Sequence, residues 1–181
     1  MTDVATADGY GVLTDPKTLR IQRLLPGPIE RVWSYLTQSD LRRKWFAAGD
    51  MEMEVGAAVE LVWRNDELTD PPGERPLETS GENRMQSRVL ELEPLRKLAI
   101  AWGSNGARVS FELEPQGSDV LLTIVHTNVP DRASLLNFGP GWHAHLDVLA
   151  AILAGERPKP FWDEFGRLKG EYAQRLPADV N

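Results

Sequence analysis

The sequence contains no cysteine in its 181 residues. Disulfide bonds, thiolate metal sites and a cysteine nucleophile are therefore excluded. The sequence also has no apolar run approaching the roughly 20 residues that span a bilayer. Met1–Gly11 carries neither the basic start nor the apolar stretch of a signal peptide. We therefore expect a cytoplasmic protein that does not bind membranes.

Positive charge is also scarce. The chain has 20 Lys and Arg against 27 Asp and Glu, which gives a formal net charge of −7. Arg42-Arg43-Lys44 is the only compact basic run, and we interpret it as the solvated end of a helix. Because a nucleic-acid surface needs clustered Lys and Arg, we expect no nucleic-acid partner.

Hydrophobic residues make up 41% of the chain, and six of its residues are Trp. A chain of this length is most simply one domain. Alternating apolar and polar residues between short turn signals predict antiparallel strands. The strands are expected at Tyr10–Leu13, Thr18–Leu25, Ala58–Arg64, Arg84–Leu92, Lys97–Trp102, Val109–Leu113 and Val120–Thr127.

The stretch 65–83 has a different composition. It is rich in Asp, Glu, Pro and Gly, with Pro71-Pro72-Gly73 at its centre. Loops longer than roughly 12–15 residues usually have a function or are mobile. The polarity of this stretch favours an exposed, mobile loop.

Helical spacing of apolar residues appears near both ends of the chain. Pro28 suits the first turn of a short helix, because its missing N–H would be unpaired there. A longer helix is expected to open at Gly139-Pro140-Gly141-Trp142 and to end near Gly155. Phe161–Leu176 predicts a further amphipathic helix, which must bury its apolar face against the main body or against a partner. A homodimer through this last helix is one expected assembly.

Several short motifs occur in the order seen in one known family. Together they resemble the Hsp90-ATPase-activator homologue family of the START-like (SRPBCC) superfamily, over roughly Thr18–Ala154. These motifs are Pro28–Trp33, Trp45-Phe46, Glu91-Leu92-Glu93-Pro94, Thr123–His126 and Gly141-Trp142.

The resemblance implies an α+β helix-grip (START-like, Bet v 1-like) fold. In that fold a curved antiparallel sheet wraps around a long C-terminal helix and leaves a pocket between them. Residues 1–155 would form the domain, and 156–181 would add a helical extension. Superfamily members bind lipids, sterols, hormones or polyketides, and a few are cyclases or aromatases. We do not expect the separate N-terminal domain by which the eukaryotic co-chaperone also engages Hsp90, so an Hsp90-type chaperone is not an expected partner.

The expected ligand is a small hydrophobic molecule held by aromatic and aliphatic side chains, with two His as polar groups. The same side chains can also simply fill the core. The candidate ligand-binding residues are Trp33, Trp45, Phe46, Trp63, Trp102, Phe111, Leu122, Ile124, His126, Trp142, His145, Leu146 and Leu149.

The three His have alternative roles. If His126 and His145 both point inward, they could meet the polar end of a ligand or act as general acid and base. Alternatively, each is a hydrogen-bonded side chain at the rim of the cavity. His143 is expected to face solvent near Asp147, one turn further along the helix. His143 and His145 point about 200° apart on a helix and cannot chelate one metal ion.

Three classes of function follow from these observations. The first is a binding module for an apolar ligand, with no catalytic residue, metal or cofactor assigned. The second is a cyclase or hydrolase that uses a pocket His and an ordered water. The third is a chaperone-linked or other protein-interaction module.

Overall fold

The computed structural model describes residues 8–77, 79 and 81–178, and in this part of the chain seven strands form one antiparallel sheet. The strand order is β1-β2-β7-β6-β5-β4-β3. The stretch 1–11, which we do not expect to be a signal peptide, lies mostly outside the described residues. The last three residues of the predicted C-terminal extension also lie outside them. The strands are β1 (Val12–Asp15), β2 (Thr18–Pro26), β3 (Ala58–Trp63), β4 (Asn83–Glu93), β5 (Lys97–Trp102), β6 (Ala107–Gln116) and β7 (Asp119–Thr127).

The inner face of the sheet follows from the alternation in the sequence. Ile124 on β7 pairs with Ile21 on β2 and with Phe111 on β6, and Phe111 pairs in turn with Leu98 on β5. All four side chains are buried. Paired residues on neighbouring strands point to the same side of the sheet, as residues two apart do on one strand. The four side chains therefore form a continuous apolar row across the sheet. The first strand lies at Val12–Asp15 and not at the expected Tyr10–Leu13, whereas the other six predicted strands and their inward faces are confirmed.

Two short helices close one end of the sheet. α1 (Ile29–Thr37) begins directly after Pro28, and α2 (Ser39–Arg42) follows it. Val32 and Leu36 are buried on the inner side of α1. The predicted helix opening at Pro28 is confirmed.

Arg42 is not part of a solvated helix end, as its place in a basic run suggested. Its side chain is 3% exposed, and burial lowers its pKa to about 10. The guanidinium ties α1 to the segment that follows α2, because its N–H groups donate to main-chain oxygens of both. The acceptors are the carbonyls of Leu36, Thr37, Ala47 and Gly49.

The long helix, α3 (Arg132–Ala154), begins earlier than expected. Asp131 caps it, since its Oδ1 accepts a hydrogen bond of 2.8 Å from the N–H of Ser134. The expectation that Gly139-Pro140-Gly141 opens this helix is wrong, because Pro140 lies inside it. Gly155 ends the helix as expected, with a φ of 73°.

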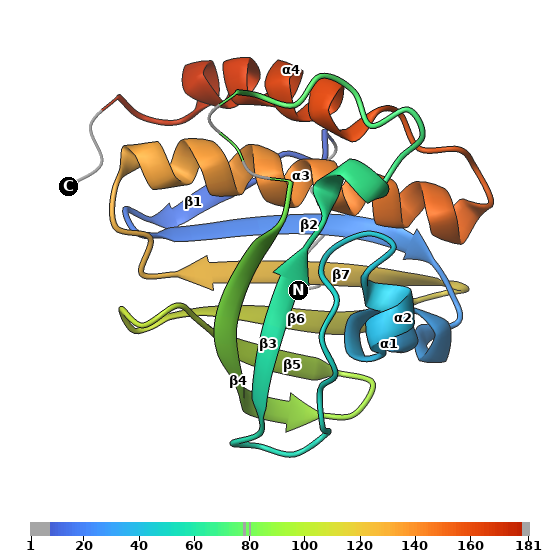
Figure 1. Cartoon of the computed structure of the whole chain (residues 1–181). Helices are drawn as coiled ribbons and strands as arrows, with labels where there is room; N and C mark the ends of the chain where they lie inside the picture. Colours follow the sequence, from blue (N-terminus) through green and yellow to red (C-terminus); the bar gives the residue numbers. More distant parts are fainter. Residues whose placement is uncertain (1–7, 78, 80, 179–181) are drawn as a thin grey trace.

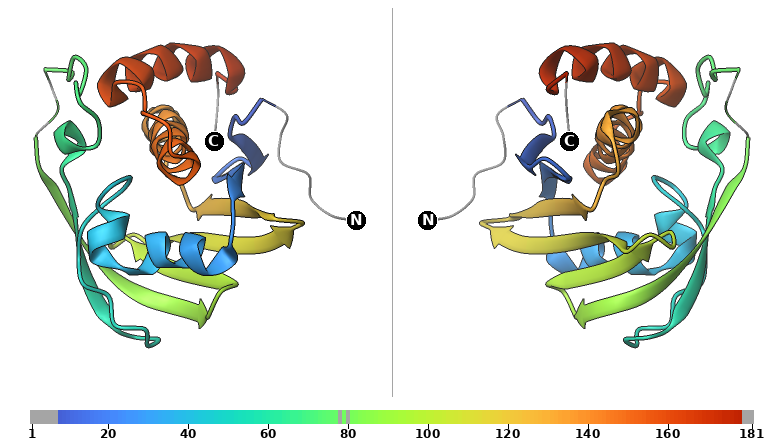
Figure 2. Two further views of the ribbon diagram at one scale, coloured as in Figure 1. Left: turned by 90° about the vertical axis from the view of Figure 1, so that its right-hand side faces the viewer. Right: turned by 90° about the vertical axis from the view of Figure 1, so that its left-hand side faces the viewer.

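α3 lies between the sheet and α4 (Phe161–Arg175), as Figures 1 and 2 show. The sheet curves around one side of α3, and α4 crosses its other side. Together these elements form the α+β helix-grip arrangement with an added helix. Gly139 allows the two helices to approach closely, because a Cβ there would lie 3.0 Å from the ring of Tyr172.

The apolar face of α4 is covered within the same chain. Phe161, Trp162, Leu168 and Tyr172 are buried. The predicted amphipathic helix is therefore confirmed, with the main body as the surface that covers it. A homodimer through α4 would have to use a different face.

His143 lies in this helix–helix contact and does not face solvent, so that expectation is wrong. The side chain is only 6% exposed, and its Nδ1 lies 3.0 Å from the hydroxyl of Tyr172. That hydroxyl accepts a 2.7 Å hydrogen bond from the N–H of Gly11. The expected neighbour Asp147 lies 3.5 Å from Nε2 and pairs with Arg23 at 2.9 Å. Burial, aided by nearby Arg side chains, lowers the pKa of His143 to about 3.

The 65–83 loop begins with a short 3₁₀ helix, Asn65–Glu67, and runs up to the start of α4. The Phe161 N–H donates to Thr69 Oγ1 at 2.9 Å, and the indole of Trp162 donates to Asp66 at 2.7 Å. Leu68 and Thr69 are buried. The expectation of a wholly exposed loop is therefore wrong, because α4 covers part of it.

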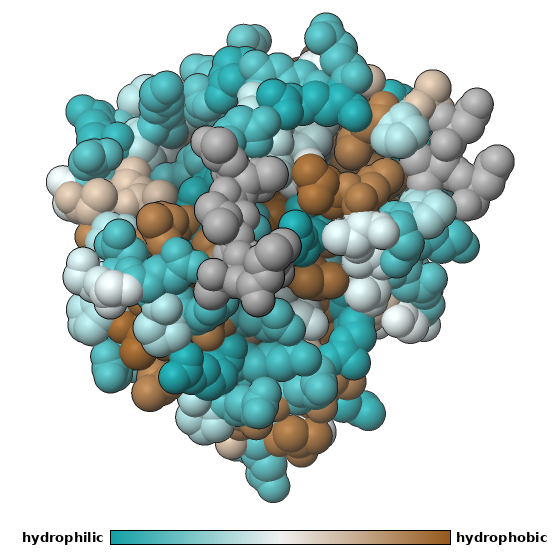
Figure 3. Space-filling view, turned by 180° about the vertical axis from the view of Figure 1, so that it is seen from behind, coloured by the Kyte–Doolittle hydropathy of each residue, from teal (hydrophilic) through white to brown (hydrophobic). Residues whose placement is uncertain are grey.

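Seen from the opposite side, the surface is mainly hydrophilic, and hydrophobic side chains occur in several separate patches (Figure 3). Among the described residues, the large hydrophobic side chains that are exposed are Val12, Leu24, Met53, Val55 and Leu77. No helix in this part of the chain is both long and apolar enough to cross a membrane.

Candidate functional site

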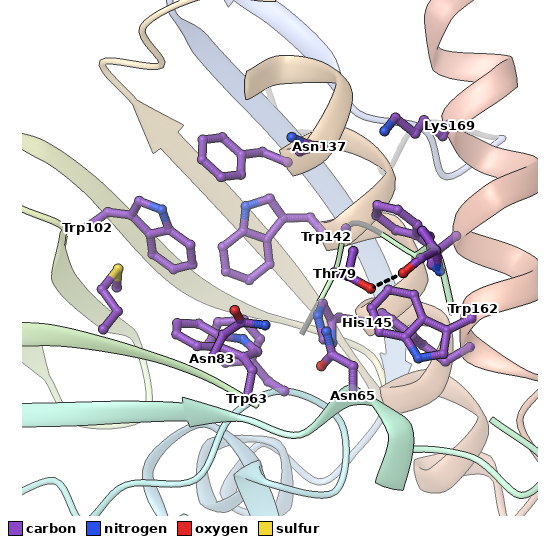
Figure 4. A pocket seen from close by; sticks show the side chains of 17 residues that line it. Trp63, Asn65, Thr79, Asn83, Trp102, Asn137, Trp142, His145, Trp162 and Lys169 are labelled. Atoms are coloured by element: carbon purple, nitrogen blue, oxygen red, sulfur yellow. Dashed lines mark hydrogen bonds between the residues drawn. The ribbon is translucent and has the colours of Figure 1, made fainter. Parts of the chain in front are cut away.

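A cavity of about 560 Å³ lies beside α3, between the β3–β5 side of the sheet and α4. Figure 4 shows its walls. The sheet contributes the ends of three strands, α3 contributes one face, and the 65–83 loop and α4 close the remaining side. Its lining residues are Phe46, Trp63, Asn65, Pro76, Thr79, Asn83, Met85, Trp102, Asn137, Phe138, Gly141, Trp142, His145, Phe161, Trp162, Phe165 and Lys169.

Aromatic rings form the sheet side of this cavity. Phe46 stacks on Trp142 with 5.0 Å between ring centroids and meets Trp63 edge to face at 5.2 Å. Trp102 lies 5.6 Å from Trp63 and 5.5 Å from Trp142. Trp63 and Trp102 are the last residues of β3 and β5, so the strand ends place both indoles at the same rim of the sheet. The cluster presents flat, apolar walls.

Of the predicted ligand-binding residues, Phe46, Trp63, Trp102, Trp142 and His145 line this cavity. Trp33 is partly buried and packs against the core, away from the cavity lining. His126 lines an adjoining cavity. The rest are buried and do not line the main cavity: Trp45, Phe111, Leu122, Ile124, Leu146 and Leu149.

The sequence reasoning missed one whole wall. Phe161, Trp162 and Phe165 reach the cavity from α4, and Asn65 and Thr79 reach it from the loop. The aromatic stripe of α4 was visible in the sequence. What the stripe packs against was not, because the contact joins segments about 90 residues apart.

His145 is held in one orientation and one protonation form. Its Nδ1 lies 2.7 Å from the carbonyl oxygen of Trp45, which can only accept a hydrogen bond, so Nδ1 carries the proton. Burial lowers the pKa of His145 to about 4, although the Trp45 carbonyl acts in the opposite direction. At neutral pH the ring is uncharged, and Nε2 is therefore a hydrogen-bond acceptor.

His126 has the opposite arrangement. The Trp142 indole donates to its Nδ1 at 3.1 Å, so the proton of the neutral ring is on Nε2. Burial lowers the pKa of His126 to about 4. Nε2 is buried and has no hydrogen-bond partner among the described residues. The ring borders a second cavity of about 330 Å³, which shares Met85, Trp102 and Phe138 with the main one.

The two His therefore do not form an acid–base pair, because each is bound to a different Trp. Both rings are neutral at pH 7, so neither supplies a charge to the cavity. Among the described residues, no group of three or more His, Asp and Glu side chains is placed to hold a metal ion.

The comparisons with known proteins agree with this architecture. A family model described as "Activator of Hsp90 ATPase homolog 1-like protein" matches residues 26–154. The chain belongs to this family. The matched region of this Hsp90-ATPase-activator homologue domain includes α3 and ends before α4, so the α4 wall of the cavity lies outside it. A comparison with curated proteins found no match.

Solved structures share the fold. A protein from Bordetella parapertussis, determined by solution NMR, is 37% identical, with a TM-score of 0.75, over 100% of this chain and 99% of its own. CalU16 from Micromonospora echinospora is 23% identical, with a TM-score of 0.64, over 88% of this chain and 87% of its own. The Aha1 dimer from Colwellia psychrerythraea is 16% identical, with a TM-score of 0.56, over 75% of this chain and 95% of its own.

Proposed function

We propose that this member of the family binds a small, largely apolar molecule in the main cavity and makes or breaks no bond in it. The observation that carries the proposal is the aromatic cavity itself. Its volume of about 560 Å³ falls within the range of roughly 300–1,000 Å³ of small-molecule sites. Its walls combine Trp and Phe rings with a few polar groups, which is the usual composition of such sites.

Binding is favoured over a cyclase or hydrolase reaction by the state of the His that lines the cavity. A general base works best when its pKa lies near the working pH. The pKa of His145 is lowered to about 4. A base this weak removes a proton poorly at neutral pH, whereas a neutral imidazole is well suited to hold a ligand by a hydrogen bond.

Gly141 offers a way to fill the cavity without disturbing the fold. It lines the cavity from α3, and a Cβ added there meets no atom within 4 Å. Gly166 on α4 is a matched control, since it is also helical and open but is exposed and does not line the cavity. Replacing either Gly by Phe should raise helix propensity by about 0.5 kcal/mol.

The test is titration of each protein with a neutral fluorescent probe, N-phenyl-1-naphthylamine, followed by thermal unfolding with and without it. We expect the wild type and Gly166→Phe to bind the probe and to gain about 2.7 kcal/mol at a hundredfold excess over the dissociation constant. Gly141→Phe should remain folded and lose binding at least about tenfold. Equal binding by both variants would place the probe outside this cavity and refute the proposal.

A further inference from the structure

Among the described residues, Lys169 is the one charged side chain that lines the main cavity. No described Asp or Glu belongs to the lining. The chain as a whole has 27 of these acidic residues and a formal net charge of −7. His145 adds no charge, because burial lowers its pKa to about 4. The charge that this part of the chain offers to a ligand is therefore positive.

Lys169 continues the aromatic stripe of α4. Phe161, Phe165 and Lys169 recur every four residues, so they lie on one side of the helix and line the same cavity. The helical rise places the Cα of Lys169 about 12 Å from that of Phe161. The α4 wall therefore runs from the buried ring of Phe161 to the exposed side chain of Lys169.

α3 forms a second wall with the same polarity. Asn137, Gly141 and His145 also recur every four residues and line the cavity. The buried ring of His145 lies 4.9 Å from that of Phe161, centroid to centroid. Asn137 is exposed, and Figure 4 shows it with Lys169 at the same end of the view, away from His145. At this exposed end an ammonium group and an amide group can both donate hydrogen bonds.

The charge of Lys169 is available to a ligand. Other cations of α4 are paired within the chain, since Arg167 lies 2.6 Å from Glu164 and Arg175 lies 2.8 Å from Asp8. Lys169 has no ion-pair partner among the described residues. A negative group at this end of the cavity would therefore replace no existing contact.

We propose that the ligand is an amphipathic carboxylate, whose apolar body lies among the Trp and Phe rings and whose carboxylate pairs with Lys169. This inference rests on the proposed function and gives the chemical class of the ligand. The carboxylate stays at the exposed end, because burying a charge without a partner is costly. The amide N–H of Asn137 is a second donor at that end.

The experiment measures the dissociation constants of three probes by quenching of Trp fluorescence at neutral pH. The probes are 2-naphthoate, its uncharged methyl ester and naphthalene. We expect all three to bind the wild type. Raising the salt from about 0.01 M to about 1 M should weaken 2-naphthoate at least about twofold relative to the ester, because salt screens an exposed ion pair.

Two substitutions at Lys169 isolate its charge, and the ester and naphthalene show whether the cavity is intact. Lys169→Gln should weaken 2-naphthoate about threefold relative to the ester, and Lys169→Glu at least about fivefold. Binding of naphthalene should be unchanged. Lys159→Glu is the matched control, since Lys159 is also exposed but does not line the main cavity. It should keep the wild-type ratio of the two dissociation constants.

The outcomes separate this inference from the proposed function. An unchanged ratio in Lys169→Glu, or an equal fall of the ratio in Lys159→Glu, would overturn the pairing with Lys169. Failure of 2-naphthoate alone to bind would also overturn it and would leave the proposed function standing. Failure of all three probes would overturn the proposed function together with the inference.

Discussion

Acid should destabilise the protein in a window set by its three His. His126, His143 and His145 are all buried, and their pKa values are lowered to about 4, 3 and 4. Their ordinary value is 6.5, so the unfolded chain binds protons at pH 5 that the folded chain does not. A group with a lowered pKa of this kind favours folding above pH 6.5 and loses that contribution as the pH falls towards 4.

The size of the effect follows from linkage. Between pH 7 and pH 5, each of these imidazoles should remove about 2 kcal/mol from the free energy of unfolding, or about 6 kcal/mol for the three. Near pH 5 the slope should approach 4 kcal/mol per pH unit. Asp147 acts in the opposite direction, because burial raises its pKa and the folded state holds its proton more tightly. The loss of about 6 kcal/mol from the three imidazoles is comparable with the whole free energy of unfolding of an ordinary domain.

Urea unfolding followed by Trp fluorescence from pH 8 to pH 5 measures this slope directly. We expect a flat profile above pH 7.5 and a fall that corresponds to nearly three protons taken up on unfolding near pH 5. His143→Gln should remove about one of those protons, and an exposed substitution such as Lys169→Gln should remove none. Uptake of fewer than one proton in the wild type at pH 5 would refute the assignment of three buried, neutral rings.

Three further changes test the framework around the site, each by urea unfolding at pH 7.5. Arg42→Ala should cost about 3–5 kcal/mol, because it leaves several buried carbonyls without a donor, and a cost below 1 kcal/mol would contradict that role. Gly139→Ala should destabilise by about 1–3 kcal/mol despite its better helix propensity, since the new Cβ meets the Tyr172 ring; a gain in stability would show that the helices separate easily. Asp131→Ala should cost about 1 kcal/mol through loss of the cap on Ser134, whereas Asp131→Asn should keep most of it.

The sheet could be predicted because its residues alternate. In β7, Leu122, Ile124 and His126 point inward, as their spacing indicates, and the pairing with β2 and β6 follows the chain order. Local patterns of this kind are sufficient for strands, since the side-chain period of a strand is fixed at two.

The start of α3 could not be read in the same way. Gly139-Pro140-Gly141 looks like a break in a helix, yet the two Gly residues have long-range surroundings that the local sequence does not display. Gly139 makes room for the ring of Tyr172, and Gly141 borders the cavity. Tertiary packing here outweighs the low helix propensity of Gly and Pro.

The candidate site could be predicted only in part, because some of its residues come together through long-range contacts. Trp63 and Trp102 were found because strand periodicity points them inward. Asn65 and Phe161 were missed because they become neighbours of the same cavity only when the loop and α4 meet. His143 was misplaced because a face of α3 that looks exposed when the helix is considered alone is covered by α4.

Two parts of the chain thus contribute the side chains that line the cavity. Trp63, Trp102 and Trp142 belong to the domain that the family shares, and Phe161, Trp162 and Phe165 belong to a helix added after it. Replacing only α4 would change the shape of the cavity and would leave the strands of the β-sheet unchanged. Substitutions on the cavity side of α4 therefore change the lining of the cavity without replacing any residue of the region that the family model matches.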